Sequence, residues 1–336
     1  MNAERPHLTR RRAWNAARWA LGIGVVALMV VGLDAAEVMA RITAANGLLV
    51  VVAVLGLTAV HVLGATTWAI LCRQLAGLRL GWASALRVYY AGQALGGVTP
   101  ANLGGDAYRV VAVRNAGSGW GAAVAPVLVQ RATSYLAVAL LALPAIGLLA
   151  FGSHLSSAIL PAATLLCGLA GGVGIVMLAA PSGLTRLLSR LSRTAEDADG
   201  AAMGTWARPP VRSMVTGTGL GLAFHGVSVL LTAVLIAAVD PSAVGAPVVA
   251  AIVVARLSLA VPILPSGLGA NEAILALLFT GLGLAPQTAL AGLLLGRVAL
   301  VLTTLIGASI LFFGRPQIPG SSEHRVARGA GVVTPR

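Results

Sequence analysis

Six long apolar segments constrain this chain more than any other feature. Each approaches or exceeds the roughly 20 residues that a helix needs to cross the hydrocarbon core of a bilayer. Only 10% of the residues are charged and the mean hydropathy is +0.91, whereas about a quarter of the residues in soluble domains are charged. The sequence therefore predicts an all-α polytopic membrane protein with about six full transmembrane helices. The segments are 17–33, 48–71, 121–150, 155–180, 214–239 and 288–313.

The charge balance predicts the orientation of these spans. All 23 basic residues are arginine and the formal net charge is +13. They are spread between apolar segments, which argues against a nucleic-acid-binding face and favours the cytoplasmic excess of basic residues typical of membrane proteins. We expect the N-terminal segment 1–16, the connection 181–213 and a disordered tail 315–336 to be cytoplasmic. Segment 17–33 resembles a leader peptide, but the polytopic remainder favours an uncleaved first span.

A single transmembrane domain is predicted over residues 17–314. The connections on its outer side, 34–47, 151–156 and 240–246, are short. Two further apolar stretches, 84–119 and 246–285, are interrupted by proline and glycine and must return to the side on which they start. Irregular backbone at that depth is tolerated only where it is buried or faces water. We therefore predict two re-entrant or broken helix hairpins.

The two broken stretches carry similar motifs. Residues 100–107 read PANLGGDA and residues 265–273 read PSGLGANEA. Asp106 precedes Arg131 by 25 residues, and Glu272 precedes Arg297 by the same number. The predicted orientations of the two regions are opposite, which is typical of an inverted repeat. The repeat units would be approximately 48–151 and 213–314.

Each motif predicts a break followed by a new half-helix. Proline ends the preceding helix, glycine permits a tight turn and close backbone approach, and the second new helix should begin near Ala270. Its free N–H groups carry partial positive charge, so an acid in the first turn is favourable. The residues that form the two breaks are Pro100, Gly104, Gly105, Pro265, Gly267 and Gly269.

Charged side chains within the apolar stretches are the candidate substrate-binding groups. A central charge costs about 2.5–3.5 kcal/mol in a bilayer, so such residues are usually functional. Three structural alternatives remain open: helix capping by the acids, snorkelling of the arginines, and ion pairs that bind nothing. The candidates are Asp106, Arg109, Arg131, Arg256, Glu272 and Arg297.

The remaining polar residues predict little further chemistry. His61 and His225 could relay protons or could be ordinary contacts between helices. Cys72 and Cys167 lie far apart, without metal spacing, and fit small packing positions. No nucleotide, metal or cofactor motif occurs, so we expect neither metal nor cofactor.

At these residues the chain resembles the transmembrane domain of the lysylphosphatidylglycerol synthetases, also called the flippase-like domain family. The resemblance lies in GQALGGVTPANLGGDAYRVVAVRNAG with VLVQR, and in VPILPSGLGANEA with LLLGR, and covers about residues 15–314. It implies a membrane fold that handles lipid and assigns roles to Asp106, Arg109, Arg131, Glu272 and Arg297.

The chain departs from the family pattern at Gln130, Ser266 and Asn271. No soluble transferase-like domain follows the last span, so lysyl transfer is not expected and the chain is more plausibly not an enzyme.

We expect a multi-pass lipid transporter of the cell membrane that acts on an anionic, aminoacylated or polyprenyl-phosphate lipid. The alternatives are an enzyme or enzyme partner in envelope lipid or glycolipid synthesis, and a structural scaffold.

Overall fold

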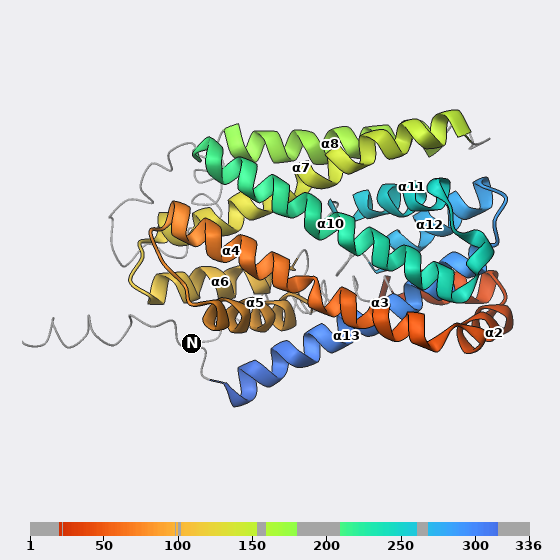
Figure 1. Ribbon diagram of the computed structural model, residues 1–336, viewed down its shortest axis with the longest axis horizontal. Coiled ribbons are helices and arrows are strands. Elements are labelled where there is room, and N and C mark those ends of the chain that lie inside the picture. The colour runs from red at the N-terminus through yellow and green to blue at the C-terminus, as the bar shows by residue number, and fades with distance from the viewer. Residues whose placement is uncertain are drawn as a thin grey trace, which may run out of the picture.

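A computed structural model describes residues 20–21, 23–97, 99, 102–152, 159–179, 209–260 and 268–314. Within these ranges the chain is helical and contains no strand. The long helices lie roughly along the longest axis of the molecule (Figure 1). The all-α polytopic class predicted from the sequence is confirmed.

Among the described residues, five helical segments are long and apolar enough to cross a membrane. Each matches a predicted span to within four residues at either end, because an uninterrupted apolar run longer than the bilayer core satisfies its backbone only as a helix. The first is divided at Val60 into α3 and α4. The segments are α3–α4 (Gly47–Ala59 and His61–Leu75), α7 (Trp120–Gly152), α8 (Ile159–Ala179), α10 (Val211–Val239) and α13 (Pro286–Phe313).

The sixth predicted span, 17–33, is only partly described and ends in a sharp turn. A helix over Ile23–Gly32 is followed, at an angle of 93°, by α2 (Ala35–Ala44). The Asp34 side chain accepts a hydrogen bond from the backbone N–H of Ala36, which begins the new helix. The prediction that 34–47 is a simple connection was therefore wrong. Its buried Val38 packs with Leu290 of α13, an amphipathic contact that hydropathy alone does not reveal.

Two helix hairpins complete the fold, and they lie at opposite ends of the molecule (Figure 1). The first consists of α5 (Trp82–Gly97) and α6 (Leu103–Asn115). The second consists of α11 (Ala246–Ala255), which ends in the 3₁₀ turn η3 (Arg256–Ala260), and α12 (Ala270–Gly281). Both predicted breaks are thus confirmed as interruptions between two helices, and residues 98, 100–101 and 261–267 within them lie outside the described residues. A further 3₁₀ turn, η2 (Pro241–Ala243), joins α10 to the second hairpin.

Glycines allow the first hairpin to pack backbone against backbone. A Cβ atom on Gly105 of α6 would lie 2.3 Å from the carbonyl oxygen of Gly92 in α5. On the other side of α5, a Cβ atom on Gly307 of α13 would lie 2.0 Å from the carbonyl oxygen of Tyr90. Small residues permit this close approach between membrane helices, so α5 is clamped between α6 and α13.

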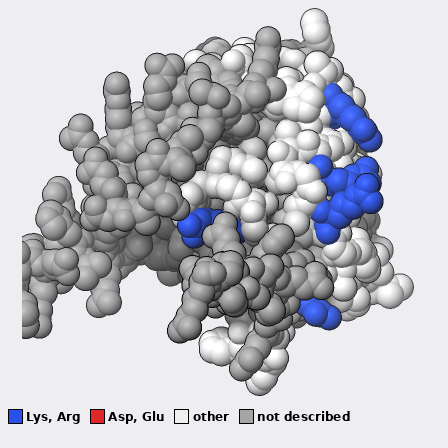
Figure 2. All heavy atoms as spheres, turned by 90° about the vertical axis from the view of Figure 1, so that its left-hand side faces the viewer, with Lys and Arg blue, Asp and Glu red and all other residues white. Residues whose placement is uncertain are grey.

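The two ends of the molecule differ in charge. At the end where α4 finishes and α10 begins, the exposed charges of the described residues are basic, and Figure 2 shows only basic side chains coloured on this face. At the opposite end Arg41 pairs with Glu37 at 2.8 Å and with Asp240 at 3.9 Å, and Asp34 lies nearby in sequence. The exposed arginines of the basic end are Arg73, Arg79, Arg87, Arg114 and Arg212.

Candidate functional site: a charged cavity between the helices

A cavity of about 470 Å³ lies between α4, α5, α6, α7, α10, α12 and α13. Arg131 and Arg297 both line it, each 11 residues after the first residue of its helix, α7 or α13. A helix rises 1.5 Å per residue, so each arginine lies about 16 Å along the helix axis from the first residue of its helix. α7 and α13 start from opposite ends of the molecule (Figure 1), and both arginines line the one cavity.

The cavity wall contains more positive than negative charge. Four guanidinium groups face two carboxylates, which leaves a formal surplus of two positive charges among the described lining residues. Buried charges of this kind are costly unless they are paired or bind a ligand. The charged lining residues are Asp106, Arg109, Arg131, Arg256, Glu272 and Arg297.

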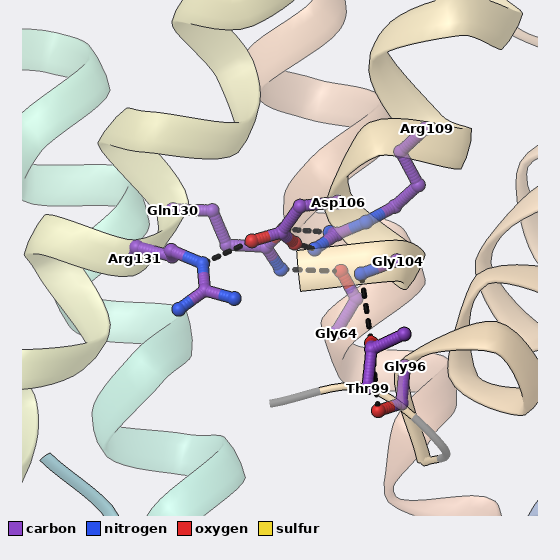
Figure 3. Close-up of polar contacts among 8 residues, drawn as sticks. All are labelled: Gly64, Gly96, Thr99, Gly104, Asp106, Arg109, Gln130 and Arg131. Carbon is purple, nitrogen blue, oxygen red and sulfur yellow. Dashed lines mark hydrogen bonds and ion pairs between the residues drawn. The ribbon is translucent and has the colours of Figure 1, made fainter. Parts of the chain in front are cut away.

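Asp106 is the centre of the first charged cluster (Figure 3). One carboxylate oxygen pairs with the guanidinium of Arg109, one turn along α6, and the other pairs with Nε of Arg131 on α7. The side chains of Asp106 and Arg109 are almost completely buried. The 25-residue spacing noted in the sequence therefore corresponds to a buried contact across the connection between α6 and α7.

Gln130 holds this cluster in place and was not predicted as a site residue. Its side-chain oxygen accepts a hydrogen bond of 2.6 Å from Arg109, and its amide nitrogen donates one of 2.8 Å to the backbone oxygen of Gly64 in α4 (Figure 3). The guanidinium of Arg109 also lies 5.1 Å from the centre of the Tyr89 ring. The sequence marked Gln130 only as a departure from the family pattern, directly before Arg131.

The first turn of α6 explains how Asp106 reaches the cavity. Asn102 adopts the left-handed conformation with φ of 60°, and the chain enters the helix directly after it. The hydroxyl of Thr99 accepts a 2.8 Å hydrogen bond from the backbone N–H of Gly104. Asp106 follows in the same turn, as predicted. Pro100 lies outside the described residues.

Glu272 is the centre of the second charged cluster and is fully buried. One carboxylate oxygen accepts a hydrogen bond of 2.7 Å from Nε of Arg297, and the other accepts one of 2.9 Å from the backbone N–H of Gly269. Gly269 has φ of 87°, a conformation that favours glycine. α12 begins at Ala270, as predicted. Pro265 and Gly267 lie outside the described residues.

Arg256, at the end of α11, occupies a different environment. Its guanidinium donates hydrogen bonds of 3.0 Å to the backbone oxygen of Ser228 and to the hydroxyl of Thr232, both on α10. Its Nε is buried without a hydrogen-bond partner among the described residues. No ion pair joins Arg256 to a carboxylate within the described part of the chain.

His61 and His225, which the sequence offered as possible proton relays, also line the cavity. Nε2 of His225 lies 2.8 Å from the hydroxyl of Ser134 on α7. The ring of His61 lies 5.8 Å from that of Phe224. Nδ1 of each histidine is buried without a partner among the described residues. Whether either relays protons stays a prediction.

Comparison with known families assigns the chain to one of them. The family described as "Lysylphosphatidylglycerol synthase TM region" matches residues 15–307. The chain belongs to this family. No curated protein and no solved structure shows a significant match to the chain. Membership of the lysylphosphatidylglycerol synthase TM region family confirms the resemblance drawn from the two motifs and their arginines.

All six candidate residues of this family member meet at one cavity, but they do not form one cluster. The structure divides them into the Asp106 group, the Glu272–Arg297 pair and Arg256. Ion pairing, one of the structural alternatives, accounts for both carboxylates. It does not account for Arg256. The buried free cysteines Cys72 and Cys167 lie in packed regions, as predicted.

Proposed function

We propose that this protein moves a membrane lipid with a phosphate-bearing headgroup between leaflets through the charged cavity. The surplus of positive charge on the cavity wall carries this proposal. Guanidinium groups bind phosphate oxygens with paired, charge-assisted hydrogen bonds, and such bonds strengthen where water is scarce. A lipid phosphate that enters the cavity would supply the negative charge that the described wall lacks.

The arrangement of the two hairpins supports transport rather than simple binding. They lie at opposite ends of the molecule (Figure 1), and each presents an acid to an arginine 25 residues further along. We propose that the halves form an inverted repeat and expose the cavity alternately to either side. We propose that the basic end faces the cytoplasmic side of the cell membrane, with both termini on that side.

Reconstitution into proteoliposomes tests this function. Leaflet-resolved movement of a fluorescent phosphatidylglycerol would be compared between the wild-type protein and Arg131→Ala, Arg297→Ala and the double variant. We expect at least a tenfold lower rate in each single variant, because each removes a cavity charge. The matched control is Arg73→Ala, which removes an exposed arginine at the end of α4 and should leave the rate unchanged.

A double variant with the full wild-type rate would overturn the mechanism. If the correctly folded wild-type protein moves neither phosphatidylglycerol, an aminoacyl lipid nor a polyprenyl phosphate, transport is the wrong activity. The protein would then act as an enzyme, or as the partner of an enzyme, in envelope lipid synthesis.

A further inference from the structure

Both carboxylates of the cavity are already engaged by the protein itself. Asp106 is shared between the guanidinium groups of Arg109 and Arg131. Glu272 binds Arg297 and the backbone N–H of Gly269. The negative charge of each carboxylate is thus already offset by at least one guanidinium group, so an ammonium group on a ligand would meet no uncompensated negative charge on this wall. The described wall therefore offers no ready site for a cationic headgroup.

Arg256 is the opposite case, because it is a buried cation whose described partners are all neutral oxygens. Two of its hydrogen bonds go to Ser228 and Thr232, and its Nε has no partner among the described residues. The segment that follows η3, residues 261–267, reads VPILPSG and contains no acidic side chain. That segment cannot supply the missing counterion.

A second donor lies beside Arg256 on the same cavity wall. His225 precedes Ser228 by three residues on α10, so the two share one helix face. The His225 side chain is buried, and its Nδ1 has no partner within the described residues. When the hydroxyl of Ser134 donates to Nε2 of His225, Nδ1 carries the proton and points to an acceptor that the described protein does not provide.

We infer that the cavity selects anionic lipid phosphates and discriminates against lysylated lipids, and that Arg256 and His225 bind the phosphate oxygens. This inference rests on the proposed function and narrows its substrate. Phosphatidylglycerol has one negative charge, which offsets half of the surplus of two positive charges, and a polyprenyl phosphate has up to two, which offset all of it. Lysylphosphatidylglycerol carries two ammonium groups and one phosphate, so its net positive charge would add to the surplus.

The first experiment compares lipids on the wild-type protein. The purified full chain, in phosphatidylcholine nanodiscs, is titrated with a fluorescent polyprenyl phosphate, which is then displaced by phosphatidylglycerol, lysylphosphatidylglycerol or inorganic phosphate. We expect phosphatidylglycerol to displace the probe at a concentration at least tenfold lower than lysylphosphatidylglycerol. Inorganic phosphate should displace little of it, because free phosphate lacks the acyl chains that concentrate a lipid in the bilayer.

Equal or tighter binding of lysylphosphatidylglycerol would overturn the inference and leave lipid handling intact. Full displacement by millimolar inorganic phosphate would show that the site serves free phosphate, and would overturn the lipid assignment. Absence of binding by every lipid would overturn the inference and the proposed function together. The three failures are therefore distinguishable.

Arg256→Gln tests the phosphate site directly. This change keeps an amide donor, on a shorter side chain, but removes the charge, so we expect at least a tenfold loss of affinity for phosphatidylglycerol. Arg73→Gln, on the exposed basic end, is the matched control and should bind as the wild type does. Unchanged affinity in Arg256→Gln would overturn the assignment. If this variant misfolds, two other measurements test the assignment. One is the affinity of His225→Ala, which removes the second donor, and the other is the lipid comparison on the wild-type protein.

Discussion

Asp106 and Glu272 each lie in the first turn of the second helix of a hairpin, and each meets an arginine 25 residues later. Their other partners differ. Asp106 receives a second guanidinium from Arg109, whereas Glu272 receives the backbone N–H of Gly269. The same motif therefore produces a closed ionic cluster in one hairpin and an ion pair with a helix cap in the other.

The first hairpin is also more closely packed than the second. Gly104 and Gly105 precede Asp106 and bring α6 into backbone contact with α5. The corresponding positions before Glu272 hold Ala270 and Asn271, and Asn271 lines the cavity. The comparison teaches that the shared motif determines the acid–arginine pair, while the neighbouring residues determine how much of the hairpin remains available to a ligand.

Removal of each acid should give the largest difference in stability between variants of the two hairpins. Asp106→Ala removes the carboxylate that pairs with two guanidinium groups, those of Arg109 and Arg131, and breaking a buried pair costs about 3–5 kcal/mol. Glu272→Ala removes the carboxylate that pairs with one, that of Arg297, so we expect a smaller loss of stability. The measurement is the apparent Tm in detergent, read by a thiol-reactive dye that reports exposure of buried Cys72 and Cys167. A larger loss for Glu272→Ala would contradict the comparison.

A methyl group should distinguish the packing of the hairpins. In Gly105→Ala the new Cβ would meet the carbonyl oxygen of Gly92 at 2.3 Å, and overpacking of this kind costs about 1–3 kcal/mol. Asn271→Ala, at the corresponding position of the second hairpin, should cost less than about 1 kcal/mol. Equal Tm values for the two variants would show that the close contact of α5 and α6 contributes nothing.

The two helix starts use different caps, and the first can be tested alone. Thr99→Ala removes the acceptor of the Gly104 N–H and should cost about 1 kcal/mol. Thr43→Ala is the matched control, since the Thr43 hydroxyl is exposed and bonds only to carbonyls of its own helix. We expect the Tm of the control to stay near that of the wild type. If Thr99→Ala lowers the Tm no more than Thr43→Ala does, the cap does not stabilise the start of α6 and packing alone does.

The smallest effect is expected at the connection from α6 to α7. The guanidinium of Arg114 lies 4.2 Å from the centre of the Trp120 ring, and an exposed contact of this type contributes about 0.5–1 kcal/mol. Arg114→Ala should therefore lower the Tm slightly, while Arg87→Ala, an exposed arginine on α5, should not. A decrease in Tm as large as that of Gly105→Ala would show that this connection stabilises the first hairpin as much as the close contact of α5 and α6 does.

Much of this architecture could be predicted because the bilayer restricts the choices. Apolar runs longer than the membrane core become helices, so the described parts of the spans lie where the sequence placed them. The break motifs fixed the start of α12 at Ala270, and the matched 25-residue spacings identified the partners of Asp106 and Glu272. Each of these features is marked in the sequence by an apolar run or by a motif that occurs twice.

The features that were missed are contacts that no repeated motif marks in the sequence. Gln130 joins Arg109 to the backbone of Gly64, and Arg256 binds oxygens of α10 that precede it by 24 to 28 residues. The turn into α2 depends on a cap at Asp34 and on packing against α13. Hydropathy and motif spacing describe each segment separately, so they contain no information on which neutral groups meet in the folded chain.

The close contact at Gly307 has a mechanical consequence. Ten residues before this glycine, α13 holds Glu272 of the second hairpin through Arg297, and at Gly307 it presses against Tyr90 of the first. The two attachments are about 15 Å apart on one helix. We therefore expect α13 to act as a stiff lever between the ends of the molecule, so that displacing one hairpin tilts the other and both ends cannot stand open together.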